Sequence, residues 1–229
     1  MESWFTENAI YLLAVIAVIF SIAWLGSFRG MLKISSAAVF FVSVVFAALV
    51  YLSVKIFAVI EYLDFSAFSK MSLFGAIFFM PFAVLAAAKL LGINTAVFFD
   101  ICTPAFIFMF MCGRINCLIT GCCYGINLTE NYRWPVREGE ITLYLVLLII
   151  FCIRMKKGRF TGRCWPVFLI SYGIFRFFAE FVRWFPDQDG LWHRGHIFAA
   201  AAAAAGTVWL AASAFSKRRR ALSKHSAGL

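Results

Sequence analysis

Long apolar stretches dominate this chain and restrict the folds that are open to it. The hydrocarbon core of a bilayer is about 30 Å thick, and an α-helix needs roughly 20 apolar residues to cross it. The polar and apolar alternation that is typical of outer-membrane strands is absent, so we predict an all-α membrane protein with about seven transmembrane helices. The predicted spans are residues 9–26, 35–60, 71–90, 96–119, 140–154, 165–183 and 196–215.

The composition supports the same class of fold. Hydrophobic residues make up 63% of the 229 residues and charged residues only 14%, too few polar groups to cover a soluble domain of this size. We predict a single integral membrane domain over residues 1–229, with a short basic cytoplasmic tail at about 217–229.

Basic residues are distributed unevenly along the chain, whose formal net charge is +10. Thirteen of the 21 basic residues fall in alternate connecting segments, which is the pattern of cytoplasmic loops in multispanning proteins. The pattern predicts an N-terminus outside and a C-terminus in the cytoplasm, and it predicts no nucleic-acid partner. These basic segments contain Arg29 and Lys33, Lys89, residues 154–163 and residues 217–224.

The stretch "GRINCLITGCCYG", residues 113–125, carries an arginine at the end of an apolar run. An arginine near the bilayer centre costs about 2.5 to 3.5 kcal/mol on insertion scales, so a compensating interaction is expected. Arg114 either extends to the outer headgroups or turns inward to hold an anion, most naturally a lipid phosphate. The glycines at 113, 121 and 125 either break the helix or allow close helix packing.

A second polar group lies in "SYGIFRFFAEFVRWFPD", residues 171–187. Arg176 and Glu180 are four residues apart and Arg183 is three further on, so the three side chains share one helix face with Tyr172. The pair of Arg176 and Glu180 either ties helices together or belongs to a site. Two arginines and one glutamate leave a surplus positive charge, which suits an anionic ligand.

The seven cysteines suggest free thiols rather than disulfides, because five of them fall in or beside apolar spans. Cys112, Cys117 and Cys122 are five residues apart and do not share a face of a straight helix, which disfavours a metal site there. The adjacent pair of Cys122 and Cys123 leaves a soft metal or a redox pair as the less favoured alternative. The five cysteines in or beside spans are Cys102, Cys112, Cys117, Cys152 and Cys164.

These motifs together resemble the prolipoprotein diacylglyceryl transferase family. Residues 113–125 are similar to a divergent form of the family loop G-R-x-G-N-F-x-N-x-E-x-x-G. Asp100 and Pro104 upstream, and Pro135 and Glu140 downstream, occur in the family's order. The stretch "YGIFRFFAEFVRWFPD" is similar to the more specific Y-G-x-x-R-F-x-x-E-F-x-R-x-P-D, with the proline at 186 one residue later than in that pattern. The matches cover roughly residues 72–200, and the family's seven-helix topology agrees with the charge pattern.

The resemblance implies a transferase of the bacterial plasma membrane. It would move a diacylglyceryl group from phosphatidylglycerol, a membrane lipid, to the lipobox cysteine next to the signal peptide of a prolipoprotein, without metal or cofactor. Arg114 and Arg176 would hold the phosphate, and Glu180 and Arg183 would orient them. The motif positions assigned to substrate binding are Arg183, Tyr172, Cys117, Cys122, Gly125 and Glu140.

The chain departs from the family pattern at several positions. Cys117 and Cys122 replace an asparagine and a glutamate, and Phe74 occupies the place of a histidine. His196, where the family has glutamine, is the candidate base that deprotonates the incoming thiol. Two other functions stay open: a non-catalytic protein that binds or moves an anionic lipid or small anion, and a thiol redox protein built on Cys122 and Cys123.

Overall fold

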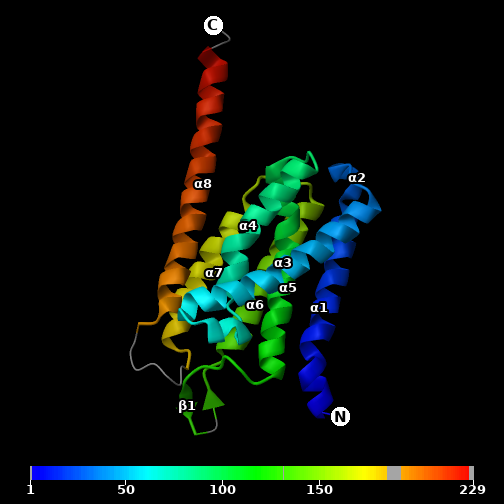
Figure 1. Cartoon of the computed structure of the whole chain (residues 1–229). Coiled ribbons are helices and arrows are strands. Elements are labelled where there is room, and N and C mark those ends of the chain that lie inside the picture. The colour runs from blue at the N-terminus through cyan, green and yellow to red at the C-terminus, as the bar shows by residue number, and fades with distance from the viewer. Residues whose placement is uncertain (1, 131, 185–191, 227–229) are drawn as a thin grey trace.

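The computed structural model describes residues 2–130, 132–184 and 192–226, and it describes side chains in 8–68, 70–130, 132–184 and 192–216. Long helices follow one another and are joined by short segments (Figure 1). The elements are α1 (Glu2–Ser27), α2 (Arg29–Leu32), α3 (Ser36–Tyr62), the 3-10 helix η1 (Phe65–Ser69), α4 (Leu73–Leu90), α5 (Thr95–Ile119), β1 (Asn127–Thr129), β2 (Tyr132–Arg133), α6 (Val136–Lys156), α7 (Cys164–Phe181) and α8 (Arg194–Ser226).

The prediction of an all-α membrane protein is confirmed. Within the described residues, six helices are long and apolar enough to cross a bilayer. The one β-element among them is a short antiparallel hairpin of β1 and β2. The six candidate spans are Asn8–Ser27, Ser36–Tyr62, Leu73–Leu90, Thr95–Ile119, Cys164–Phe181 and Arg194–Ser216.

The fifth predicted span, residues 140–154, needs a correction. It lies within α6, a helix of 21 residues that begins at Val136. The first turn of α6 therefore contains charged residues that precede the predicted span. Arg137 and Glu138 at this end, and Arg154 and Lys156 at the other, make α6 more polar than the six spans. The helix also contains the buried Glu140, whose charge is compensated inside the protein, so the length of α6 still suits a crossing.

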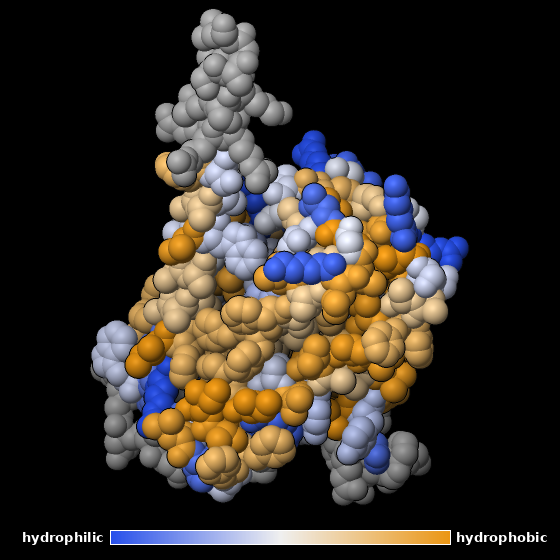
Figure 2. Space-filling view, turned by 45° about the horizontal axis from the view of Figure 1, so that its top comes forward, coloured by the Kyte–Doolittle hydropathy of each residue, from blue (hydrophilic) through white to orange (hydrophobic). Residues whose placement is uncertain are grey.

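The two chain ends lie at opposite ends of the helix bundle (Figure 1). The hairpin of β1 and β2 lies at the N-terminal end, whereas α8 runs past the rest of the bundle towards the C-terminus. Apolar side chains form a broad band on the face seen in Figure 2, with polar groups mainly above and below it. Such a band suits contact with lipid. The assignment of the N-terminal end to the outside remains a prediction from the basic residues.

The central element of the core is α5. Trp24 of α1 donates an indole hydrogen bond of 2.8 Å to the carbonyl of Ile101 in α5. Phe98, Phe106 and Phe110 on α5 are fully buried among neighbouring helices. Because α5 is packed on most of its faces, a polar side chain near its C-terminal end has protein rather than lipid around it.

Asp100, buried within α5, organises the segment that leads into α7. Its carboxylate accepts backbone N–H hydrogen bonds from Thr161 at 2.5 Å, Gly162 at 2.7 Å and Cys164 at 2.9 Å. Three bonds to an ionised acceptor hold the start of α7 against α5. These bonds fix the start of α7, and the rotation of α7 about its axis in turn determines where Arg176 points.

Candidate anion-binding site

Arg114 turns into the protein and contacts α6. Its Nε lies 2.9 Å from Oε2 of Glu140, and both side chains are buried. The N–H of this nitrogen is not aligned with the carboxylate, so the contact is an ion pair rather than a hydrogen bond. Tyr144, one turn along α6, donates a hydrogen bond of 2.9 Å to the other oxygen of Glu140. The inward orientation expected for an anion site is therefore present, and extension to the headgroups is not.

The polar face predicted on α7 joins the same cluster. Arg176 lies 2.9 Å from Glu180 and 3.6 Å from Glu140, so it connects α7 with α6. Arg183, just beyond α7, lies 3.6 Å from Glu180. The cluster thus contains three arginines and two glutamates and carries one surplus positive charge. The exposed fraction of the arginine side chains rises from 3% at Arg176 to 10% at Arg114 and 17% at Arg183.

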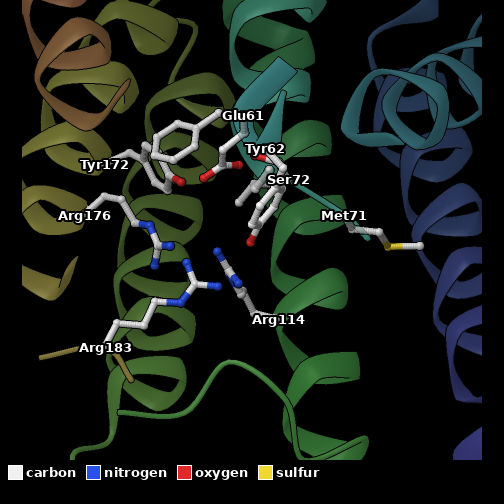
Figure 3. A pocket seen from close by; sticks show the side chains of 10 residues that line it. Glu61, Tyr62, Met71, Ser72, Arg114, Tyr172, Arg176 and Arg183 are labelled. Carbon is white, nitrogen blue, oxygen red and sulfur yellow. The ribbon is translucent and has the colours of Figure 1, made fainter. Parts of the chain in front are cut away.

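A pocket opens beside these arginines at the end of the bundle that carries the hairpin. Its cavity volume is about 20 Å³, which is room for one or two water molecules. The guanidinium groups of Arg114, Arg176 and Arg183 point toward one another in it (Figure 3). A concave site with converging donors is the usual form of a ligand site. The other lining residues are Glu61, Tyr62, Met71, Ser72, Leu73, Phe74 and Tyr172.

Four buried polar atoms of the pocket residues have no hydrogen-bond partner within the described part of the chain: the hydroxyls of Ser72 and Tyr172, and Nε of Arg114 and of Arg176. An unpaired buried polar group costs about 1 to 3 kcal/mol, so these atoms point to a ligand that would pair with them. Phe74 contacts Arg176 and Tyr172. Its ring centroid lies 5.9 Å from the guanidinium carbon of Arg176 and 6.0 Å from the ring of Tyr172.

The glycine-rich loop connects this pocket with the end of α7. The helix break comes after Ile119, and Gly113 lies within α5. Gly125 packs closely against the backbone, because an added Cβ would lie 2.5 Å from the carbonyl of Trp134 and 2.9 Å from that of Val182. Gly125 also pairs with Arg183 in an isolated antiparallel bridge. Of the two alternatives for these glycines, Gly125 therefore serves close packing. It packs against the backbone of non-helical segments rather than against a neighbouring helix.

The three cysteines of this loop region come together, which the straight-helix argument did not anticipate. Because α5 ends at Ile119, the chain turns back and brings the sulfurs of Cys117, Cys122 and Cys123 within 4.8 Å of one another. Hydrogen bonds from the thiols of Cys117 and Cys122 lower the pKa of the Cys123 thiol, and the charge of Arg183 acts in the same direction. All seven cysteines are free, as expected.

The predicted site residues divide into three groups. Arg114, Arg176, Arg183 and Tyr172 line the pocket. Glu140 and Glu180 contact its arginines rather than the open space. The remaining predicted residues, Cys117, Cys122, Gly125 and His196, are absent from the described pocket lining.

His196 lies in an aromatic environment. Its ring centroid is 4.3 Å from that of Phe181, 5.3 Å from Phe177 and 5.2 Å from Trp192. Its Nδ1 accepts a hydrogen bond of 3.0 Å from the backbone of His193. These contacts give it a packing role, and its action as a base remains a prediction that no pocket contact supports. Pro186 and Asp187 of the same motif lie outside the described residues.

Sequence reasoning missed several residues around the pocket. Glu61, Tyr62 and Ser72 line it from the end of α3 and the start of α4, and Tyr144 supports Glu140. No local pattern identifies Tyr62 or Ser72, because their position depends on how α3 meets α4. The acidic residue at 61, at the end of an apolar span, was the one available signal.

The fold and the site define a polytopic membrane protein with an arginine-rich pocket at one end of its helix bundle. A model of the prolipoprotein diacylglyceryl transferase family matches residues 8–214, and the chain belongs to this family of transferases.

A relative from Clostridium perfringens (strain 13 / Type A), phosphatidylglycerol–prolipoprotein diacylglyceryl transferase 2, is 28% identical over 86 residues. The alignment covers 31% of this chain and 34% of the relative, so the chain matches about a third of that protein's length. The likeness to this particular relative is thus much narrower than the family match, which covers most of the chain.

Proposed function

We propose that this protein transfers a diacylglyceryl group from phosphatidylglycerol to the cysteine thiol of a prolipoprotein. The observation that carries the proposal is the convergence of three arginine side chains in a pocket at one end of a membrane bundle. Family membership supports the reaction class, and the relative's name supports phosphatidylglycerol as the donor.

The charge of the site suits a phosphodiester. One phosphodiester carries one negative charge, and the three converging guanidinium groups supply donors that can pair with it. Arg114 and Arg183, the more exposed of the three arginines, meet the phosphate first, and Arg176 lies deeper. Arginine pairs with phosphate oxygens through two parallel hydrogen bonds, which fixes the orientation as well as the charge. The acyl chains then extend toward the apolar band of the bundle.

The same arginines assist bond breaking. The cysteine sulfur attacks the glyceryl carbon next to the phosphate, a C–S bond forms, and the C–O bond to the phosphate breaks. The electron pair of that bond goes to the departing glycerol phosphate, whose charge increases. Preorganised cations in a site of low water content stabilise such developing charge, and loss of one donor typically costs about a hundredfold to a thousandfold in rate.

Glu61 is the residue that we assign as the proton acceptor for the incoming thiol. It is the one carboxylate among the described lining residues. Figure 3 shows its side chain entering the pocket from the side of Tyr62 and Ser72. A carboxylate within reach of the thiol accepts its proton as the C–S bond forms.

Purified protein in liposomes that contain labelled phosphatidylglycerol provides the test. A lipobox peptide should gain the mass of one diacylglyceryl group, and glycerol phosphate should be released in equal amount. Arg114→Ala and Arg176→Ala should each lower the rate by about a hundredfold or more. Arg159→Ala, which changes an exposed arginine in the segment between α6 and α7, serves as the control and should keep the wild-type rate.

Two results would contradict the proposal. Full activity of both arginine variants would remove the phosphate role of the pocket. Tight binding of phosphatidylglycerol without any modified peptide, over several lipobox sequences, would instead support the non-catalytic lipid-binding function.

A further inference from the structure

We propose that Cys117, Cys122 and Cys123 form a binding site for one zinc ion, with a fourth position open to an external ligand. The site lies at the C-terminal end of α5, next to the arginine pocket. It does not depend on the proposed transfer reaction, because its test measures metal and not product.

The sulfur spacing fits a single ion. Zinc binds cysteine sulfur at about 2.3 Å, which places tetrahedral sulfurs about 3.8 Å apart. The three sulfurs here lie within 4.8 Å of one another. Rotation of the cysteine side chains that shortens each sulfur-to-sulfur distance by about 1 Å or less gives the tetrahedral spacing. Zinc also prefers thiolates to the oxygen ligands that hold magnesium or calcium.

The backbone around the cysteines is fixed in a form that brings them together. Gly121 and Cys123 adopt positive φ angles of 67° and 57°, which turn the chain back after α5. The Cys122 N–H donates to the carbonyl of Cys117 at 3.1 Å. Arg137 of α6 donates to the carbonyls of both Cys117 and Cys122, each at 3.3 Å. The arrangement is thus held by groups other than the thiols themselves.

Neighbouring polar groups suit thiolate ligands. Arg183 donates to the sulfur of Cys123 at 3.4 Å, and the hydroxyl of Thr120 lies 3.4 Å from the sulfur of Cys122. Three thiolates and one divalent ion leave one negative charge, and Arg183, which also lines the pocket, contacts this site through the sulfur of Cys123. Such groups around the ligands commonly strengthen metal binding.

The exposure of the three cysteines defines the kind of site. Cys122 is exposed, while Cys117 and Cys123 are half-buried, so the ion would lie at the surface with one side open to water. Three protein ligands with an exchangeable fourth is the composition of reactive zinc sites, whereas structural sites have four protein ligands. The fourth ligand is then a water molecule or an external thiol.

The full chain, purified with a non-chelating affinity tag under reducing conditions, should contain about one zinc ion by plasma mass spectrometry. The double variant Cys122→Ser and Cys123→Ser should lose it. Cys152→Ser is the matched control, because it removes a half-buried cysteine outside the cluster and should keep the ion. Arg137→Ala should weaken zinc binding by about tenfold to a hundredfold.

A measurement on the wild type guards against misfolding of the variants. Added zinc should slow alkylation of Cys122 by iodoacetamide, a chelator should restore the rate, and Cys152 should not respond to either. Replacement of zinc by cobalt should produce sulfur-to-cobalt charge-transfer absorption. The inference is overturned if reduced protein takes up no zinc and Cys122 is not protected, or if two of the three cysteines form a disulfide in the protein from cells.

Discussion

Oε2 of Glu140 lies 2.9 Å from Nε of Arg114, although the two residues come from different helices and are separated by the glycine-rich loop. The same carboxylate lies 3.6 Å from Arg176. Glu140 therefore joins the two arginines that the sequence predicts for the phosphate. It keeps two positive charges in one buried site, which mutual repulsion would otherwise disfavour.

Replacement of Glu140 should destabilise the protein. In Glu140→Gln two buried guanidinium groups lose their shared counter-ion, and breaking a buried ion pair in this way costs about 3 to 5 kcal/mol. The midpoint of thermal unfolding in detergent should fall. Phosphatidylglycerol should restore part of the loss, because an anion that binds the folded state stabilises it.

The control for this change is Glu138→Gln. Glu138 belongs to the same helix turn, but 44% of its side chain is exposed, so its loss should leave the midpoint nearly unchanged. Equal midpoints for both variants would show that Glu140 does not hold the arginines together.

Replacement of Glu61 should affect chemistry and not lipid binding. Glu61→Gln removes the proposed proton acceptor, so kcat should fall by about a hundredfold or more while KM for phosphatidylglycerol stays close to wild type. Asp64→Asn changes a nearby carboxylate that caps η1 and is not among the described lining residues of the pocket, so it should retain activity. An unchanged kcat in Glu61→Gln would assign the proton transfer to another group.

Glycine at 195 should be essential for the position of Glu180. An added Cβ at 195 would collide with the carboxylate of Glu180, so Gly195→Ala should displace it from Arg176 and lower transfer activity strongly. Gly113→Ala is the control, since a Cβ there meets nothing within 4 Å and alanine favours a helix by about 0.5 to 1 kcal/mol. The transfer rates and thermal unfolding midpoints of Gly195→Ala and Gly113→Ala test whether Gly195 positions Glu180.

Loss of the Asp100 carboxylate should loosen the segment before α7. Asp100→Asn retains one acceptor oxygen for three backbone N–H groups, and each lost bond to a charged acceptor costs about 1.5 to 3 kcal/mol. Trypsin should then cut more rapidly after Lys156 or Lys157 than in wild type. Glu130→Gln, in the distant hairpin turn, should leave the cleavage rate unchanged; a similar rate in both variants would contradict the assignment.

The sequence predicted those parts of the site that depend on local spacing. Arg176, Glu180 and Arg183 share one face because a helix repeats every 3.6 residues, and the structure pairs them accordingly. Arg114 was found because an arginine at the end of an apolar run requires compensation.

The missing parts depend on contacts between distant segments. Glu140 was recognised by its motif, but its pairing with Arg114 follows from the packing of α5 on α6, which no periodicity records. Likewise, the cysteine cluster arises because α5 ends at Ile119, so the geometry of a straight helix did not apply to Cys122 and Cys123.

The bridge between Gly125 and Arg183 sets a length constraint on both signature motifs. The N–H of Ile126 donates to the carbonyl of Val182 at 2.8 Å, and the N–H of Trp184 donates to the carbonyl of Tyr124 at 3.1 Å. These backbone hydrogen bonds set the register between residues 124–126 and residues 182–184. One residue inserted between 114 and 125, or between 176 and 183, would slide an arginine out of register with its partners. Spacing within each motif is then as restrictive as side-chain identity.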